Sequence, residues 1–207
     1  MKKILFVLFI FLSSCSPSED NKKTDKTSNN VIEVSSNIKR IMIGNENAKI
    51  VIIAYESLTC SHCANFHNEV LPKLKKEYID TGLAKIEFRH FPLDIAALNA
   101  SKIAQCESDQ SLKILESFYS NQQAWIKGST IDEINNNLKK FIQNKGFNLD
   151  IDNCLSNKEI EDFVLNDRIE GTKNFEINST PTVIINNEKF KKTLNYKNLK
   201  KFIEKLI

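Results

Sequence analysis

From about position 49 onward, the chain alternates between short apolar runs and longer stretches in which apolar side chains recur at helical spacing. Residues 49–55 form a β-branched run typical of a buried strand, and residues 64–79 have the apolar spacing of a helix. Thr81-Gly82 interrupts this pattern, and residues 84–91 then alternate between apolar and polar side chains, as in a strand. Because a helix connects them, the two strands should be parallel and joined by a right-handed crossover.

The middle of the sequence, at about 94–174, has helical periodicity with breaks at Gly128 and Gly146. The pattern predicts helices at 95–107, 112–125, 131–145 and 159–175, and another helical stretch that begins near Ile151. These helices form a block of about 80 residues, which is interpreted as a helical insertion.

The last part of the sequence returns to strand-like patterns. Residues 182–185 and 189–193 predict two short strands, and Asn186-Asn187-Glu188 between them is a hairpin signal. A helix at 195–206 ends the sequence. The expected fold class is therefore α/β, with a βαβ unit, a helical insertion and a ββα unit.

The N-terminal segment has the pattern of an export signal at 1–14. Lys2 and Lys3 precede nine apolar residues, a stretch too short for a membrane-spanning helix, which needs about 20. The residues that end at Cys15 resemble a bacterial lipoprotein signal, so cleavage before Cys15 is expected to leave it lipidated and attached to a membrane. Ordinary cleavage nearby, with Cys15 as a spare thiol, is the alternative.

Residues 15–40 are rich in Ser, Asn, Lys and Asp, a composition that cannot bury a core and predicts a flexible tether. The whole sequence has 29 basic and 26 acidic residues, and loss of Lys2 and Lys3 with the signal leaves 27 against 26, a net charge of +1. This near balance argues against nucleic-acid binding. The domain at 41–207 has the size of a single domain.

The sequence Cys60-Ser61-His62-Cys63 lies at the predicted junction between the first strand and the first helix. Two thiols separated by two residues form a reversible dithiol/disulfide pair. Unpaired N–H groups and the positive end of the helix dipole favour an anion, so Cys60 should ionise more readily than an ordinary thiol. His62 is expected to add a second positive influence.

Other chemistry fits this motif less well. A structural zinc site needs four ligands, usually from two such pairs, whereas this chain offers one cysteine pair with His62, His67 and His90 nearby, so no metal is expected. Haem attachment requires a histidine where Ala64 stands. A purely structural disulfide in so small a ring would stabilise the fold little. The motif is therefore interpreted as a redox-active pair.

Three motifs, in this order around the helical block, resemble the DsbA family of thioredoxin-fold proteins. They are Cys60-Ser61-His62-Cys63 with the following Ala-Asn-Phe-His, Phe-Arg-His-Phe-Pro-Leu at 88–93, and Ser179-Thr180-Pro181-Thr182. The family carries Cys-Pro-His-Cys, and here Ser61 replaces the proline. The resemblance covers about 43–207 and implies a thioredoxin fold with an inserted α-helical domain.

The resemblance also implies a function and site residues. Cys60, Cys63 and His62 would be catalytic, and Pro181 would be preceded by a cis peptide bond that turns the backbone of Thr180 toward the cysteines to bind substrate. The protein would introduce disulfides into reduced exported proteins, with its redox-active disulfide and no other cofactor. A quinone-linked membrane oxidase resembling DsbB would reoxidise it.

One departure from the family concerns a buried acid. Relatives often carry it six residues before the first cysteine, where this chain has Ala54. Glu56 lies two residues later and hence on the same face of the strand. Two expectations stay open: Glu56 acts as a proton relay behind the cysteines, or it caps the strand end in solvent.

Cys106 and Cys154 both fall in the helical insertion, and two cysteines in an exported domain most simply pair. Some DsbA-like proteins, particularly from alphaproteobacteria, have such a second disulfide. Two buried free thiols are the alternative.

The expected location is the periplasm, with a monomer attached to the membrane by a lipid anchor at Cys15. A periplasmic reductase or isomerase is a rival function. Isomerases of this kind usually dimerise through an N-terminal domain, for which residues 16–48 are too short and too polar. A lipid-anchored metal-binding thiol protein is a rival from another class.

Overall fold

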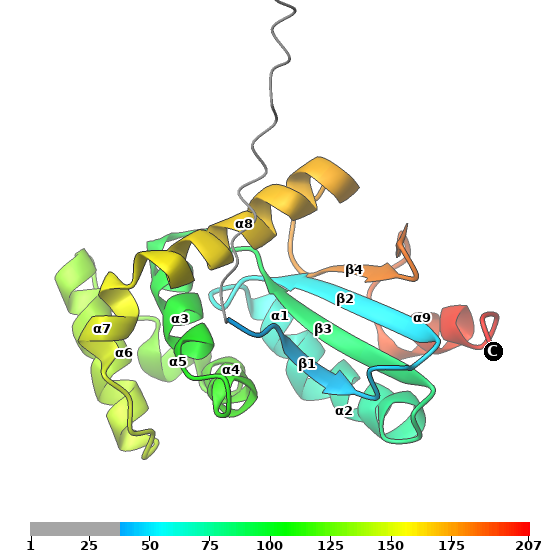
Figure 1. The fold of residues 1–207 in the computed structure, drawn as a ribbon, viewed down its shortest axis with the longest axis horizontal. Coiled ribbons are helices and arrows are strands. Elements are labelled where there is room, and N and C mark those ends of the chain that lie inside the picture. Colours follow the sequence, from blue (N-terminus) through cyan, green and yellow to red (C-terminus); the bar gives the residue numbers. More distant parts are fainter. Residues whose placement is uncertain (1–37) are drawn as a thin grey trace, which may run out of the picture. The chain divides into compact units, whose positions relative to one another are not determined.

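The computed structural model describes residues 38–207. The expected signal peptide at 1–14, the lipidation site Cys15 and all but the last residues of the expected tether at 15–40 lie outside the described residues. The described residues form a five-stranded mixed sheet in the order β1-β3-β2-β4-β5, flanked by helices (Figure 1). The strands are β1 (Ile41–Gly44), β2 (Ile50–Glu56), β3 (Ala84–His90), β4 (Thr182–Ile185) and β5 (Glu188–Lys189).

Strands β2 and β3 are parallel, as predicted, and their register pairs Ile52 with Ile86. On the other side of β2 lies the antiparallel strand β4, and β5 follows it at the edge. Strand β1 forms the opposite edge, antiparallel to β3. The sequence pattern does not predict β1, because its four residues, Ile-Met-Ile-Gly, are too few to establish a period.

Both faces of the sheet bury apolar side chains, because successive residues of a strand point to opposite sides. On β2, Ile52 and Ala54 face the main core, while Ile53 and Tyr55 face a smaller apolar cluster on the other side. Coverage of both faces explains why this strand reads as a continuous apolar run rather than as an alternating one.

The helix after β2 is longer and less regular than predicted. It begins at Ser61 and comprises α1 (Ser61–Asn65), the π-helical η1 (Phe66–Val70), α2 (Leu71–Leu74) and the π-helical η2 (Lys75–Ile79). Pro72 lacks the N–H for an ordinary helical bond and its ring crowds the preceding turn. The backbone just before it widens accordingly, and the N–H of Leu71 donates to the carbonyl of Phe66.

The inserted helices largely follow the predicted pattern. They are α3 (Ile95–Cys106), α4 (Ser111–Ser120), α5 (Gln122–Trp125), α6 (Ile131–Asn144), α7 (Ile151–Ser156) and α8 (Lys158–Phe175). The predicted helix at 112–125 is in fact two helices, because Asn121 between them leaves helical geometry, with φ −133° and ψ 31°. None of the helices within residues 38–207 combines the length and apolar character needed to cross a bilayer.

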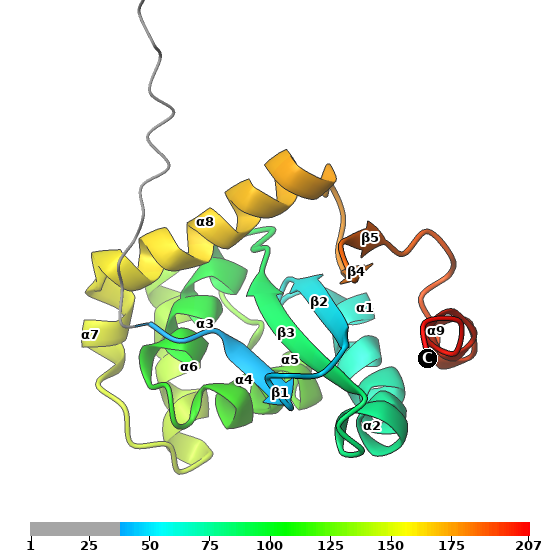
Figure 2. The same cartoon turned by 45° about the vertical axis from the view of Figure 1, so that its right-hand side comes forward.

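The C-terminal hairpin turns more tightly than predicted. Asn186 and Asn187 have positive φ angles of 46° and 66°, so the turn has two residues and β5 begins at Glu188. The predicted strand at 189–193 was too long, because β5 ends at Lys189. Helix α9 (Tyr196–Ile203) follows. Figures 1 and 2 show α3 to α7 gathered to one side of the sheet, away from α9, with α8 passing β3 toward β4.

Candidate active site

Cys60 stands where the chain leaves the sheet and enters the active-site helix. It is the N-cap of α1, with an extended backbone at φ −80° and ψ 119°. Its carbonyl accepts hydrogen bonds from the N–H groups of Cys63 (3.1 Å) and Ala64 (3.2 Å). Both cysteines of the motif are free thiols, Cys60 half-buried and Cys63 fully buried. The structure is therefore that of the reduced pair, with Cys60 as the accessible sulfur.

The surroundings of Cys60 favour its thiolate. A hydrogen bond from the Cys63 thiol, the side chain of Thr180 and the backbone N–H groups of Cys63 and His62 together lower the pKa of Cys60 to about 5, although partial burial opposes them. At pH 7 a thiol with this pKa is about 99% ionised. Cys60 thus has the properties of a nucleophile at neutral pH.

Cys63 has the opposite character. Burial raises the pKa of Cys63 far above its usual range, and the hydrogen bond to Cys60 and the charge of Glu56 raise it further. The Cys63 thiol therefore keeps its proton while its partner is ionised. This asymmetry lets one sulfur attack and the other act as the buried leaving or resolving group.

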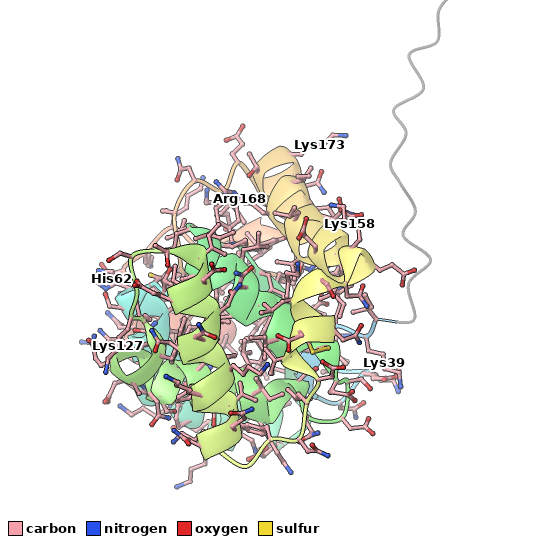
Figure 3. All side chains as sticks on the ribbon, turned by 90° about the vertical axis from the view of Figure 1, so that its left-hand side faces the viewer. Lys39, His62, Lys127, Lys158, Arg168 and Lys173 are labelled. Atoms are coloured by element: carbon pink, nitrogen blue, oxygen red, sulfur yellow. A yellow bond between two sulfur atoms is a disulfide. The ribbon has the colours of Figure 1, made fainter. Side chains whose placement is uncertain are left out.

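His62 is exposed, and Figure 3 shows its side chain at the surface. It lowers the pKa of Cys60 through its backbone N–H.

The loop before β4 lies against Cys60. The Thr180–Pro181 peptide bond is cis, and the Cys60 sulfur lies 3.4 Å from the carbonyl oxygen of Thr180, to which it donates when it is protonated. Beside this contact is a groove of about 360 Å³. Its lining includes His62, Asn65, Phe66, Thr180, Pro181 and Leu194.

Thr180→Val tests the contribution of this loop. Removing the hydroxyl while keeping the branched shape should raise the pKa of Cys60 from about 5 to about 6, because the Thr180 side chain lowers this pKa and its buried hydroxyl has no other partner among the described residues. Thiolate absorbance at 240 nm as a function of pH measures the change. Thr182→Val is the matched control, since its hydroxyl donates to the carbonyl of Ser179 at 2.7 Å and not to the sulfur. If the thiolate absorbance had the same pH midpoint in Thr180→Val and Thr182→Val, this role of Thr180 would be contradicted.

A buried acid–histidine pair lies behind the cysteines. Glu56, at the end of β2, is 3% exposed, and its Oε2 lies 2.7 Å from Nε2 of His67, which is 6% exposed. The ring of Tyr119 stacks on His67 at a centroid distance of 4.0 Å. The alternative in which Glu56 caps the strand in solvent is therefore wrong.

His67, which the sequence analysis considered only as a candidate metal ligand, is buried because η1 turns it inward. One signal pointed to this arrangement. His67 follows Cys63 by four residues and hence shares its side of the helix, and Glu56 ends the strand that this helix covers.

The other predicted cysteines lie apart from this site. Cys106, the last residue of α3, is joined to Cys154 in α7 by a disulfide. One turn before Cys106, the buried Lys102 donates to the carbonyl of Leu155 and forms an ion pair with Glu161 at 2.7 Å. Disulfide and lysine together fasten α3 to α7 and α8. Among residues 38–207, no three or more His, Cys, Asp and Glu side chains gather in a way suited to a metal ion.

Comparison with known proteins places this site in a family. The family model described as Thioredoxin matches residues 36–205. The crystal structure of Wolbachia pipientis alpha-DsbA1 is similar, with 28% sequence identity, a TM-score of 0.72, and coverage of 81% of this chain and 90% of that chain. Disulfide bond formation protein D of Bacillus subtilis is 24% identical over 196 residues, which cover 89% of this chain and 85% of that protein.

A Rickettsia conorii protein named as a protein-disulfide oxidoreductase is 32% identical over 106 residues. The match covers 45% of this chain and 38% of that relative, so the chain spans well under two thirds of the relative's length. The thioredoxin match extends over most of the sequence, and the fold and its neighbours agree with it. The chain therefore belongs to the thioredoxin family and, within it, is similar to the DsbA proteins.

Proposed function

We propose that this protein is a periplasmic thiol oxidase that introduces disulfides into exported proteins by exchange at Cys60 and Cys63. The observation that carries the proposal is the low pKa of Cys60, about 5, beside a buried Cys63 whose pKa is raised. A stable thiolate favours the reduced form, and this makes the oxidised form a stronger oxidant. The names of the relatives, which include disulfide bond formation protein D, support the same chemistry.

In the proposed reaction a substrate thiolate attacks the sulfur of Cys60 in the oxidised protein. The Cys60–Cys63 bond breaks, its electron pair goes to Cys63, and Cys63 takes up a proton. A second substrate thiolate then attacks the substrate sulfur of the mixed disulfide and displaces Cys60 as a thiolate. The substrate gains a disulfide and the protein ends as the dithiol. The redox-active disulfide is the only redox group that this reaction requires.

The proton for Cys63 is proposed to come from the pair formed by Glu56 and His67. Both side chains are buried, they lie 2.7 Å apart, and the charge of Glu56 acts on Cys63. A pair of this kind can hold one proton in a region closed to bulk water and release it when the Cys63 thiolate forms. In this proposal Glu56 takes the place of the buried acid that relatives often carry at the position of Ala54.

The groove beside Pro181 is proposed to hold the substrate as an extended segment. The Thr180 backbone beside Cys60 offers main-chain hydrogen-bonding groups, and the groove reaches from His62 to Leu194. Reduced exported proteins fit such a site, because unfolded segments present a free backbone together with a thiol.

The remaining partners are proposed from the sequence. They are a DsbB-like, quinone-linked membrane oxidase that restores the disulfide, and a membrane to which a lipid at Cys15 attaches the monomer. The alternatives are a periplasmic reductase or isomerase, or a lipid-anchored metal-binding thiol protein. The acidity of Cys60 favours the oxidase, since a reductant needs a less stable thiolate.

Alkylation of the reduced protein across pH tests the proposal. The rate of Cys60 modification by iodoacetamide should follow a single titration with a midpoint of about 5, because the thiolate is the reacting form. Equilibration with glutathione should give a reduction potential less negative than about −200 mV. Cys60→Ser controls for reaction at Cys63. A midpoint near 8 would contradict the oxidase and favour a reductase.

A further inference from the structure

The helical insertion contacts the active-site loop through one buried amide side chain. Gln122, the first residue of α5, is 8% exposed. Its Nε2 donates to the carbonyl oxygen of Leu58 at 2.7 Å and to that of Cys60 at 3.0 Å. A side chain about 60 residues further along the chain therefore binds the backbone on both sides of Thr59.

The Cys60 carbonyl is a sensitive place for such a contact. The Cys60 carbonyl accepts hydrogen bonds from the N–H groups of Cys63 and Ala64 and from the side chain of Gln122. Three donors fix the plane of the peptide group between Cys60 and Ser61, and this plane sets the direction of the amides that follow. The N–H groups of His62 and Cys63 are the ones that act on the Cys60 sulfur.

We propose that Gln122 is a positioning residue for the redox pair, which holds the Cys60 peptide group so that the first amides of α1 point at the Cys60 sulfur. The inference rests on the proposed function, in which Cys60 is the nucleophile. The amide hydrogens of Gln122 also offset the partial negative charge of the Cys60 carbonyl, which would otherwise repel the thiolate of the same residue.

The corner between α4 and α5 holds Gln122 rigidly. Trp125, which is 1% exposed, donates from its ring nitrogen to the carbonyl of Phe118 at 2.9 Å. The side chain of Asn121 donates to the carbonyl of Ser117 at 2.9 Å. These bonds fix the backbone that carries Gln122, so its two side-chain hydrogen bonds can define the geometry of the active-site loop.

Gln122→Met tests the inference on the intact reduced protein. Methionine has a similar length and no donor, so the pKa of Cys60 should rise from about 5 to about 6 and the thiolate-to-thiol ratio at pH 5 should fall about tenfold. The reduction potential should become more negative as the thiolate loses stability. Gln123→Met is the matched control, because Gln123 is exposed on the same short helix. It should leave both quantities unchanged.

The proposal would be overturned if the pH midpoint of Cys60 ionisation were the same in Gln122→Met, in Gln123→Met and in the wild type. If Gln122→Met does not fold, NMR of the wild-type protein decides. The side-chain amide protons of Gln122 should exchange slowly with D₂O and their shifts should titrate with Cys60, whereas exchange as fast as that of Gln123 would overturn the inference. These measurements need no substrate. A wild-type protein that oxidises no substrate would therefore count against the proposed function and leave this comparison intact.

Discussion

Replacing Cys63 by serine turns the protein into a covalent trap at Cys60. The Cys60 thiolate retains its accessible position and still attacks a disulfide, such as oxidised glutathione or an oxidised substrate protein. The mixed disulfide that forms can no longer be resolved by an attack from Cys63 within the same molecule. Because a well-placed group in the same molecule has a very high effective concentration, its removal should slow resolution at least about a thousandfold.

The trapped species should appear on a non-reducing gel as bands that a reductant removes, and mass spectrometry should place the adduct on Cys60. Cys60→Ser is the matched control. Its remaining thiol, Cys63, is fully buried and has a raised pKa, so it should form no adduct under the same conditions. Adducts of equal yield in both variants would contradict the assignment of Cys60 as the nucleophile.

The parts of the fold that the sequence predicted are those encoded by local hydrophobic patterns. Strand β3 and most helices of the insertion have enough residues to show a period, and β2 stands out as a continuous apolar run. The parallel pairing of β2 and β3 follows from the helix between them. Strand β1 is stable only because it pairs with β3, more than 40 residues away in the sequence. A four-residue segment carries no such information by itself.

The same distinction applies to the site. Cys60, Cys63, Thr180 and Pro181 belong to short motifs, so sequence alone proposes them. The burial of His67 depends on the widened helix before Pro72 and on the ring of Tyr119, which no local pattern specifies.

Gln122 is harder still to predict, because a glutamine in a polar stretch resembles any surface residue. Only the break in the helix at Asn121 and the fold of the whole insertion bring it to Cys60. Contacts of this kind depend on tertiary structure.

Removing the second disulfide should have the largest effect on stability. Cys106 and Cys154 are separated by 48 positions, and closing a loop of this length lowers the entropy of the unfolded chain. In the chain-entropy model, the double variant Cys106→Ala with Cys154→Ala should lose about 4 kcal/mol of the free energy of unfolding. Urea denaturation without reductant, with the Cys60–Cys63 pair oxidised in both proteins, measures the difference.

A variant at Lys102 separates the contribution of the disulfide to the free energy of unfolding from that of the contacts around it. Lys102→Met removes the ion pair with Glu161 and the bond to the Leu155 carbonyl but leaves the disulfide in place. A loss below about 1 kcal/mol in the double cysteine variant would contradict the chain-entropy argument for this pair.

The reduction potential of Cys60–Cys63 in the same double cysteine variant tests whether the two cysteine pairs are coupled. Helix α3 leads into α4, which carries Tyr119, and then to Gln122 at the start of α5. Loosening α3 should therefore change the reduction potential of the Cys60–Cys63 pair. An unchanged reduction potential would mean that the second disulfide acts on stability alone.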